Sequence, residues 1–189
     1  MIKLSEIKKI FELINKYNTF NSGYSARSQF PIPGLWEATG GSPQLFDALI
    51  TGCRLKYSHY RASEVFTPEI ENDIKTIVRL NPQSITYNFG CFDLGFNNAT
   101  PIFAACINDN IPTSIIEFLL ESGADPYTTV YACDNNLSII PILKTQISEE
   151  RFETIFNLFK KYGFDLKNLS FDSSFSKKYI NSLNSLNEM

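Results

Sequence analysis

The clearest pattern of hydrophobic and polar positions lies within residues 98–128. Four apolar residues there recur at positions i, i+1, i+4 and i+5, which places them on one face of a helix. They are Ile115, Ile116, Leu119 and Leu120. The pattern therefore predicts a helix whose apolar face packs against other elements.

Local signals mark the ends of two helices in this segment. Thr100-Pro101 opens the first one, because proline at the first helical position loses no needed N–H and already has a helical φ. Ala104 and Ala105 follow, and they are small enough to let a second helix approach closely. Gly123 ends the second helix, where a left-handed residue satisfies the last carbonyls. The segment therefore predicts a helix-turn-helix unit.

An amphipathic helix is predicted over residues 4–17. Its apolar face is expected to contain Ile7, Ile10, Phe11 and Ile14. A helix this short is marginal alone, so the apolar face must dock on something. We interpret it as an N-terminal capping helix over residues 1–17. The alternative is a helix that fills a groove of a partner protein.

A weaker version of the central unit precedes it, within residues 43–82. Its first helix is predicted over 43–53 and its second over 69–80. The insertion 53–68 between them is either an extension of the first helix or a loop. Upstream, Trp36 lies among turn-forming residues, and it either packs against the helices or serves as an exposed anchor for a partner.

A third unit is predicted within residues 137–167. Pro141 should lie in the first turn of its first helix, because a proline further along would remove a helical hydrogen bond. The second helix has an apolar face made of Phe152, Ile155, Phe156 and Phe159. A last helix, about residues 174–186, is expected to cap the C-terminal end.

The order Thr-Pro-Ile-Phe-x-Ala, then Ile-Ile-x-Phe-Leu-Leu-x-x-Gly-Ala-Asp-Pro, resembles an ankyrin repeat. The resemblance implies one all-α domain over 1–189, a short helical-repeat solenoid of about three helix pairs with capping helices at both ends. The chain departs from the family at Phe103, which replaces a histidine, so the Thr–His hydrogen bond that braces adjacent repeats is absent. The spacing from Gly123 to Gly163 is 40 residues, against 33 in the family.

In ankyrin repeats the connections between units form β-hairpin fingers, and the alternation of Ile85, Tyr87 and Phe89 is compatible with a short strand. Fingers and the exposed side of the first helices together grip a partner in that family. The resemblance therefore implies partner-binding residues Asn88, Phe89, Phe92, Asp93, Phe96, Asn108, Asp109, Tyr127, Tyr131 and Asp134. The alternative is that several of these aromatics seal a finger against the next repeat.

Composition narrows the class of function. The chain has 189 residues, of which 43% are hydrophobic and 20% charged, so it can bury a core. The net charge of −3 provides no basic field for nucleic acid. One basic and aromatic cluster remains as a candidate for nucleic-acid or phosphopeptide binding, although a solvated helix extension is favoured. It consists of Arg54, Lys56, Tyr57, His59, Tyr60 and Arg61.

Catalytic and metal-binding patterns are not found in the sequence. A cysteine enzyme would have to use Cys53 with His59, but six residues place them on nearly opposite sides of a helix. The four cysteines form no C-x-x-C pair and only one histidine is present, so neither a zinc site nor a cofactor is expected. We therefore expect no enzyme, with a small cysteine-dependent enzyme as the alternative.

The expected location is the cytoplasm, since reduced thiols are the likeliest state and residues 1–18 do not resemble a signal peptide. No run of about 18 apolar residues predicts a membrane span. We expect a monomeric protein–protein interaction module. Its composition is similar to ankyrin proteins that intracellular bacterial pathogens inject into host cells, which implies a bacterial effector that binds a host protein and is secreted without a cleavable signal peptide.

Overall fold

The computed structural model describes residues 3–17, 44–49, 65–86, 89–91, 96–132 and 135–168. This part of the chain is mostly helical and contains little strand. The α-helices are α1 (Leu4–Lys16), α3 (Gln44–Leu49), α4 (Pro68–Leu80), α5 (Pro101–Ile107), α6 (Thr113–Glu121), α7 (Ile139–Gln146) and α8 (Glu149–Lys161). The remaining elements are the 3-10 helices η1 (Pro82–Thr86) and η3 (Leu166–Asn168) and the strands β1 (Phe89–Cys91), β2 (Phe96–Ala99), β3 (Thr129–Ala132) and β4 (Asn135–Ser138).

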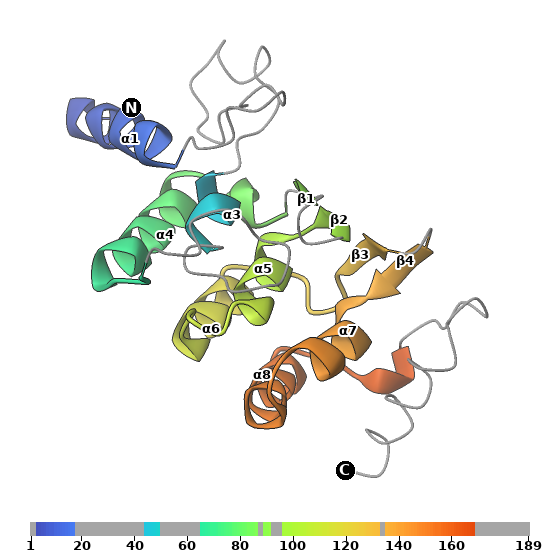
Figure 1. Cartoon of the computed structure of the whole chain (residues 1–189). Coiled ribbons are helices and arrows are strands. Elements are labelled where there is room, and N and C mark those ends of the chain that lie inside the picture. Colours follow the sequence, from blue (N-terminus) through green and yellow to red (C-terminus); the bar gives the residue numbers. More distant parts are fainter. Residues whose placement is uncertain are drawn as a thin grey trace.

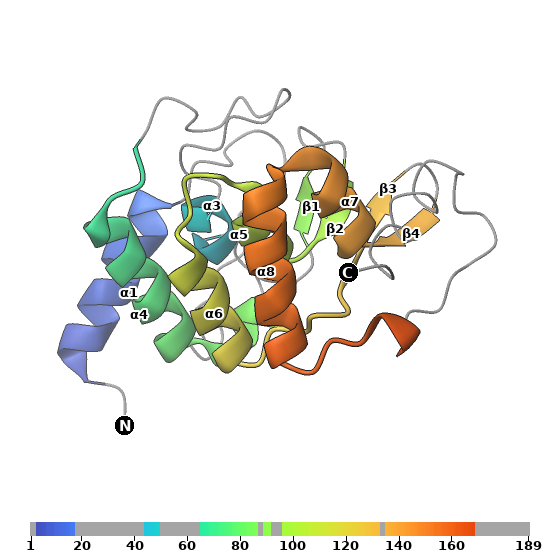
Figure 2. The ribbon, with the colours of Figure 1, turned by 90° about the horizontal axis from the view of Figure 1, so that it is seen from below.

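The helices form two layers. Helices α4, α6 and α8 lie side by side in an outer row, and α1 continues this row at one end (Figure 2). Helices α3, α5 and α7 form the inner layer, and the strands extend from it on the side away from the outer row (Figure 1). Contacts between α3 and α4, α5 and α6, and α7 and α8 join consecutive helices into pairs.

The predicted helix ends are confirmed where local signals were strong. Thr100 caps α5 by accepting a hydrogen bond from the Phe103 N–H, and Pro101 is the first helical residue. Gly123 and Gly163 follow α6 and α8 with φ of 98° and 92°, the left-handed conformation that suits glycine. Pro141 lies in the first turn of α7, as its missing N–H requires.

Two hairpins pair into one antiparallel sheet in the order β1-β2-β3-β4, which we call the hairpin sheet. A single residue pair, Asn97 with Tyr131, joins the first hairpin to the second. Ile85 was expected to belong to a strand, but it lies in η1 and its side chain is buried, whereas Phe89 does belong to a strand, β1.

The core is continuous through both layers. It takes in the predicted faces of α4, α6 and α8, including Ile74, Ile115 and Phe156. Every side chain of α5 is buried, from Pro101 to Ile107. The inner helix of the central pair is therefore enclosed on all sides, which the sequence pattern did not predict.

Helix α1 docks as predicted, but through a different face. Its buried side chains are Ile10, Leu13 and Tyr17, whereas Phe11 is 50% exposed and Leu4 is 70% exposed. The expected grouping of Phe11 with Ile10 in the docked face is therefore wrong. The reason is that α1 is oriented by polar contacts with α4, which a hydrophobicity pattern does not include.

These polar contacts converge on Asp73 of α4, whose side chain is almost completely buried. Its carboxylate accepts hydrogen bonds from Lys16 Nζ at 2.8 Å and Tyr17 Oη at 2.9 Å, and Lys9 Nζ lies 3.3 Å away. Burial raises the pKa of the Asp73 carboxyl, but the hydrogen bonds from Lys16, Tyr17 and Lys9 outweigh burial, and the pKa lies below its ordinary value.

This arrangement predicts an acid-sensitive contribution to stability. A lowered folded-state pKa means that Asp73 stabilises the fold above the unfolded pKa of about 3.9, and that this contribution is lost as pH falls through the folded pKa. Urea unfolding of wild type and Asp73→Asn at neutral pH and at about pH 3 should show a gap in stability that narrows in acid. A gap of equal size at both pH values would contradict the prediction.

Several predicted elements lie outside the described residues. They are Trp36, the greater part of the insertion 53–68, and the C-terminal helix at 174–186. Among the residues that are described, none belongs to a helix long and apolar enough to cross a bilayer.

Candidate functional site

Six of the ten predicted partner-binding positions have no described side chain. Asn88, Phe92, Asp93 and Asp134 lie outside the described residues. Phe89 begins β1 and Phe96 begins β2, so their backbones belong to the hairpin sheet; their side chains are not described. All of these residues stay predictions.

Tyr131 occupies the centre of the hairpin sheet. Its Cα pairs with Asn97 on β2 and with Asn136 on β4, so the three positions form one row across three strands. Residues directly opposite one another share a face of a sheet. Tyr131 is half-buried and Asn136 is exposed, and Thr129, two residues away on the same face, is exposed as well. This face therefore presents uncharged polar groups around one aromatic ring.

The opposite face of the second hairpin belongs to the core. Val130 and Leu137 are paired across the strands and both are buried. Because alternate residues point to opposite faces, their burial keeps Tyr131 and Asn136 on the outer side. The core thus determines which side chains the hairpin presents.

Tyr127 has an internal role instead of a surface one. Its hydroxyl accepts a hydrogen bond from the Asp165 N–H at 2.7 Å and donates to the Gly163 carbonyl at 3.1 Å. Its ring packs against Phe164, with 4.9 Å between centroids. Tyr127 therefore seals the start of the second hairpin against the end of α8, which agrees with the alternative interpretation of the predicted aromatics.

Asn108 was predicted to be a surface residue, and this is wrong. It is fully buried, and its Nδ2 donates to the carbonyl of Leu49, the last residue of α3, at 2.8 Å. Its Oδ1 accepts from the Asn110 N–H at 3.1 Å. Buried amides need such partners because an unpaired polar group is costly. Asn108 therefore satisfies the end of the preceding inner helix.

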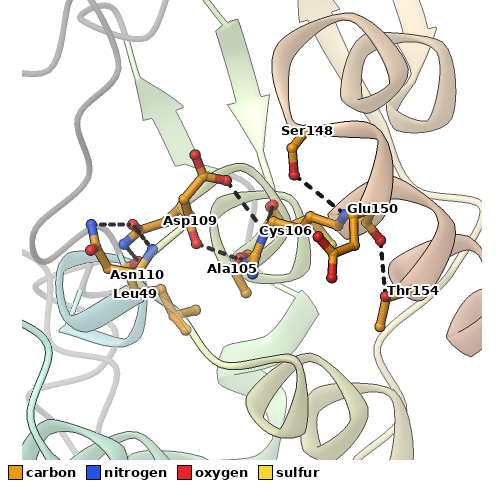
Figure 3. Close-up of polar contacts among 10 residues, drawn as sticks. Leu49, Ala105, Cys106, Asp109, Asn110, Ser148, Glu150 and Thr154 are labelled. Carbon is orange, nitrogen blue, oxygen red and sulfur yellow. Dashed lines mark hydrogen bonds and ion pairs between the residues drawn. The ribbon is translucent and has the colours of Figure 1, made fainter.

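Arg151 makes a similar contact in the next helix pair, because it too bonds to carbonyls at the end of an inner helix. From the first turn of α8 its guanidinium donates to the carbonyls of Ala105, Cys106 and Asn108 at 3.1, 3.3 and 2.8 Å. Figure 3 shows Ala105 and Cys106 with Asp109 close by. Positive charge is favourable at a helix C-terminus, where the last carbonyls lack partners. No pattern in the sequence singled out Arg151, because an arginine three residues after Ser148 is an ordinary residue in the first turn of an amphipathic helix.

Asp109 was predicted to bind a partner together with Asn108, and unlike Asn108 it lies at the surface. Its side chain is 71% exposed, and its carboxylate lies 3.6 Å from Arg151 Nε. An exposed ion pair of this length contributes little to stability. Asp109 and its neighbour Asn110, which is hydrogen-bonded to Asn108, are exposed beside the end of α5, and the role of Asp109 stays a prediction.

The described residues include a buried free thiol, that of Cys106. Burial raises the pKa of the Cys106 thiol, and the nearby Arg151 guanidinium offsets this only in part, so the thiol stays protonated. No group of three or more histidine, cysteine or acidic side chains within the described part of the chain is placed to hold a metal ion. Cys53, His59 and the cluster 54–61 lie outside the described residues.

Comparison with known proteins neither supports nor contradicts the resemblance to ankyrin repeats. No family model, no curated protein and no solved structure matches the chain. The ankyrin resemblance and the function that it implies therefore stay predictions.

Proposed function

We propose that the chain is a non-catalytic module that binds a partner protein, and that it is built as a short ankyrin-like solenoid. Three helix pairs, each followed or preceded by a hairpin, are the expected units of such an array. A paired unit cannot bury its apolar face alone, and the core that runs through α4, α6 and α8 supports burial by stacking.

Contacts between successive units also support the stacked arrangement. The hydroxyls of Thr100 and Thr128, which precede the central helix pair and follow it, lie 3.2 Å apart. Asn108 reaches back to the first unit, and Arg151 reaches back to the second. These polar links differ from the Thr–His link of the family, yet they connect the same neighbours.

The binding surface in this proposal is the outer face of the hairpin sheet. The observation that carries it is the row Asn97–Tyr131–Asn136, which two separate hairpins place in one register. A sheet supported by the buried Val130 and Leu137 holds these positions without help from a partner. Preorganised positions lose less entropy on binding, which favours affinity.

The inner helices contribute less than the resemblance implies. All of α5 is buried, so a partner meets the hairpin sheet and the exposed Asp109–Asn110 turn instead of an open helix face. Tyrosine, asparagine and threonine together suit a polypeptide partner, because an aromatic ring supplies contact area and amides bond to peptide groups.

The test compares two double-alanine variants of matched chemistry. Tyr131→Ala with Asn136→Ala removes two side chains from the outer face of the hairpin sheet. Asn157→Ala with Tyr162→Ala removes an asparagine of α8 and the tyrosine that directly follows this outer-row helix. Partners captured by the wild-type protein are purified, and the dissociation constant of each is measured against all three proteins. We expect the hairpin variant to bind at least about tenfold more weakly, which corresponds to about 1.4 kcal/mol.

The control variant is expected to bind within about twofold of wild type. Circular dichroism and thermal melting of both variants establish that they are folded. If the hairpin variant keeps wild-type affinity for every captured partner while the outer-row variant loses it, the binding surface lies on the outer helices and the proposal is wrong.

A further inference from the structure

Helix α1 and the start of α4 lie at one end of the described structure (Figures 1 and 2). This end carries exposed apolar side chains. The large hydrophobic residues that are exposed among the described ones are Leu4, Phe11 and Val65, at 70%, 50% and 76%. All three belong to α1 or to the segment that leads into α4. Apolar exposure gathered at one end is typical of a surface that meets another polypeptide.

The site on α4 that holds α1 is specific. It combines the buried carboxylate of Asp73 with apolar residues of α4, such as Ile70 and Ile74, that share one core with Leu13 and Tyr17. Lys16 bridges Asp73 and Glu69, with Nζ–O distances of 2.8 and 2.7 Å. A helix that fits must therefore bring cations and a tyrosine hydroxyl to the same carboxylate.

The chain does not require that this helix come from the same molecule. The polar contacts between α1 and α4 join residues 53 to 64 positions apart. Residues 18–43, 26 in number, connect Tyr17 to α3. A connection of that many residues can span at most about 90 Å, far more than docking within one chain needs.

Helix α1 is also complete as a unit of structure. At its N-terminus the Glu6 carboxylate accepts a hydrogen bond from the Lys3 N–H at 3.0 Å, which satisfies one of the N–H groups at the start of the helix. Its contacts with the described residues that are given above are made with residues from 69 onward or with the common core, and an α1 from another copy can make these same contacts.

We propose that the Asp73 site of α4 accepts the α1 helix of a second copy, so that two copies exchange their N-terminal helices. Exchange of an identical element is a low-cost route to a dimer, because each site keeps the contacts that it has in one chain. The exchanged dimer also brings two ends with exposed Leu4 and Phe11 together, where these side chains can be covered. This inference is independent of the hairpin sheet and of the proposed function.

The experiment uses the natural Lys16–Glu69 contact as a reporter. Equal amounts of ¹⁴N and ¹⁵N protein are unfolded together in urea and refolded together, so that every α1 selects an α4 afresh. Monomer and dimer fractions are separated by size, and a carbodiimide then joins Lys16 to Glu69 through an amide bond. Mass spectrometry of the cross-linked peptides reads the isotope of each half.

An internal control is present in every molecule. Lys75 Nζ and Glu71 Oε1 lie 2.7 Å apart on α4 itself, so their cross-link must always carry one isotope. We expect a dimer fraction in which roughly half of the Lys16–Glu69 cross-links are mixed, as random pairing of two isotopes requires. The monomer fraction should contain only same-isotope links.

Three outcomes overturn the proposal. The first is the absence of a dimer fraction at high protein concentration. The second is a dimer whose Lys16–Glu69 links are all of one isotope, which means that the copies meet at another surface. The third is a Lys75–Glu71 product without any Lys16–Glu69 product, which means that α1 does not dock on Asp73 in either form.

Discussion

Replacement of Phe103 by alanine is expected to destabilise the fold by about 3–5 kcal/mol, the range for a large aromatic side chain removed from a core. Phe103 is fully buried in α5, and α5 has no exposed side chain through which the cavity could collapse toward solvent. Single domains have a total stability of about 5–15 kcal/mol, so the variant should be close to unfolding.

Urea unfolding followed by circular dichroism measures this loss. Phe11→Ala in α1 is the matched control, because Phe11 is half exposed and its removal leaves no closed cavity. We expect it to cost less than about 1 kcal/mol. Equal losses for the two phenylalanines would mean that α5 is not enclosed as described.

Replacement of Arg151 by alanine is expected to cost about 3 kcal/mol. The guanidinium satisfies the carbonyls of Ala105, Cys106 and Asn108, and hydrogen bonds to charged groups contribute about 1.5–3 kcal/mol. Its removal also leaves carbonyls of a buried helix without partners. Arg151→Lys should recover less than half of the loss, since an ammonium cannot reach three acceptors in the planar geometry of a guanidinium.

Arg79→Ala is the control for the loss of an arginine, because Arg79 lies exposed in the last turn of α4. Its removal should change stability by no more than about 0.5 kcal/mol. Hydrogen exchange on the amides of α5 supplies a second readout, since loss of the cap should speed exchange there before it does in α1. If Arg151→Ala and Arg79→Ala unfold at the same urea concentration, the three carbonyl contacts do not stabilise the protein.

Both predictions concern the coupling of neighbouring units. Phe103 lies in the inner helix of the central pair, and Arg151 connects the last pair to that helix. In the stacked array that we propose, the stability of each unit depends on its interface with the next. Loss of either residue should therefore reduce cooperativity as well as stability, visible as a shallower slope of the unfolding curve against urea.

The sequence by itself determined the local elements of this protein. Thr100-Pro101, Gly123 and Pro141 marked helix boundaries correctly, because caps and turns depend on residues within one or two helical turns. The apolar face of α8 was predictable for the same reason, since Phe152 and Phe156 lie one turn apart and both are buried. Signals of this range need no knowledge of what lies across the core.

Only the tertiary structure decided which side chains face solvent at the unit boundaries. Asn108 is buried where its amide donates to the carbonyl at the end of α3. Arg151 lies where its guanidinium donates to the carbonyls at the end of α5. The docked face of α1 includes Tyr17, which is buried and hydrogen-bonded to Asp73, whereas Phe11 is exposed. In each case the partner lies 43 to 59 residues away, and no local pattern encodes which distant group will complete a hydrogen bond.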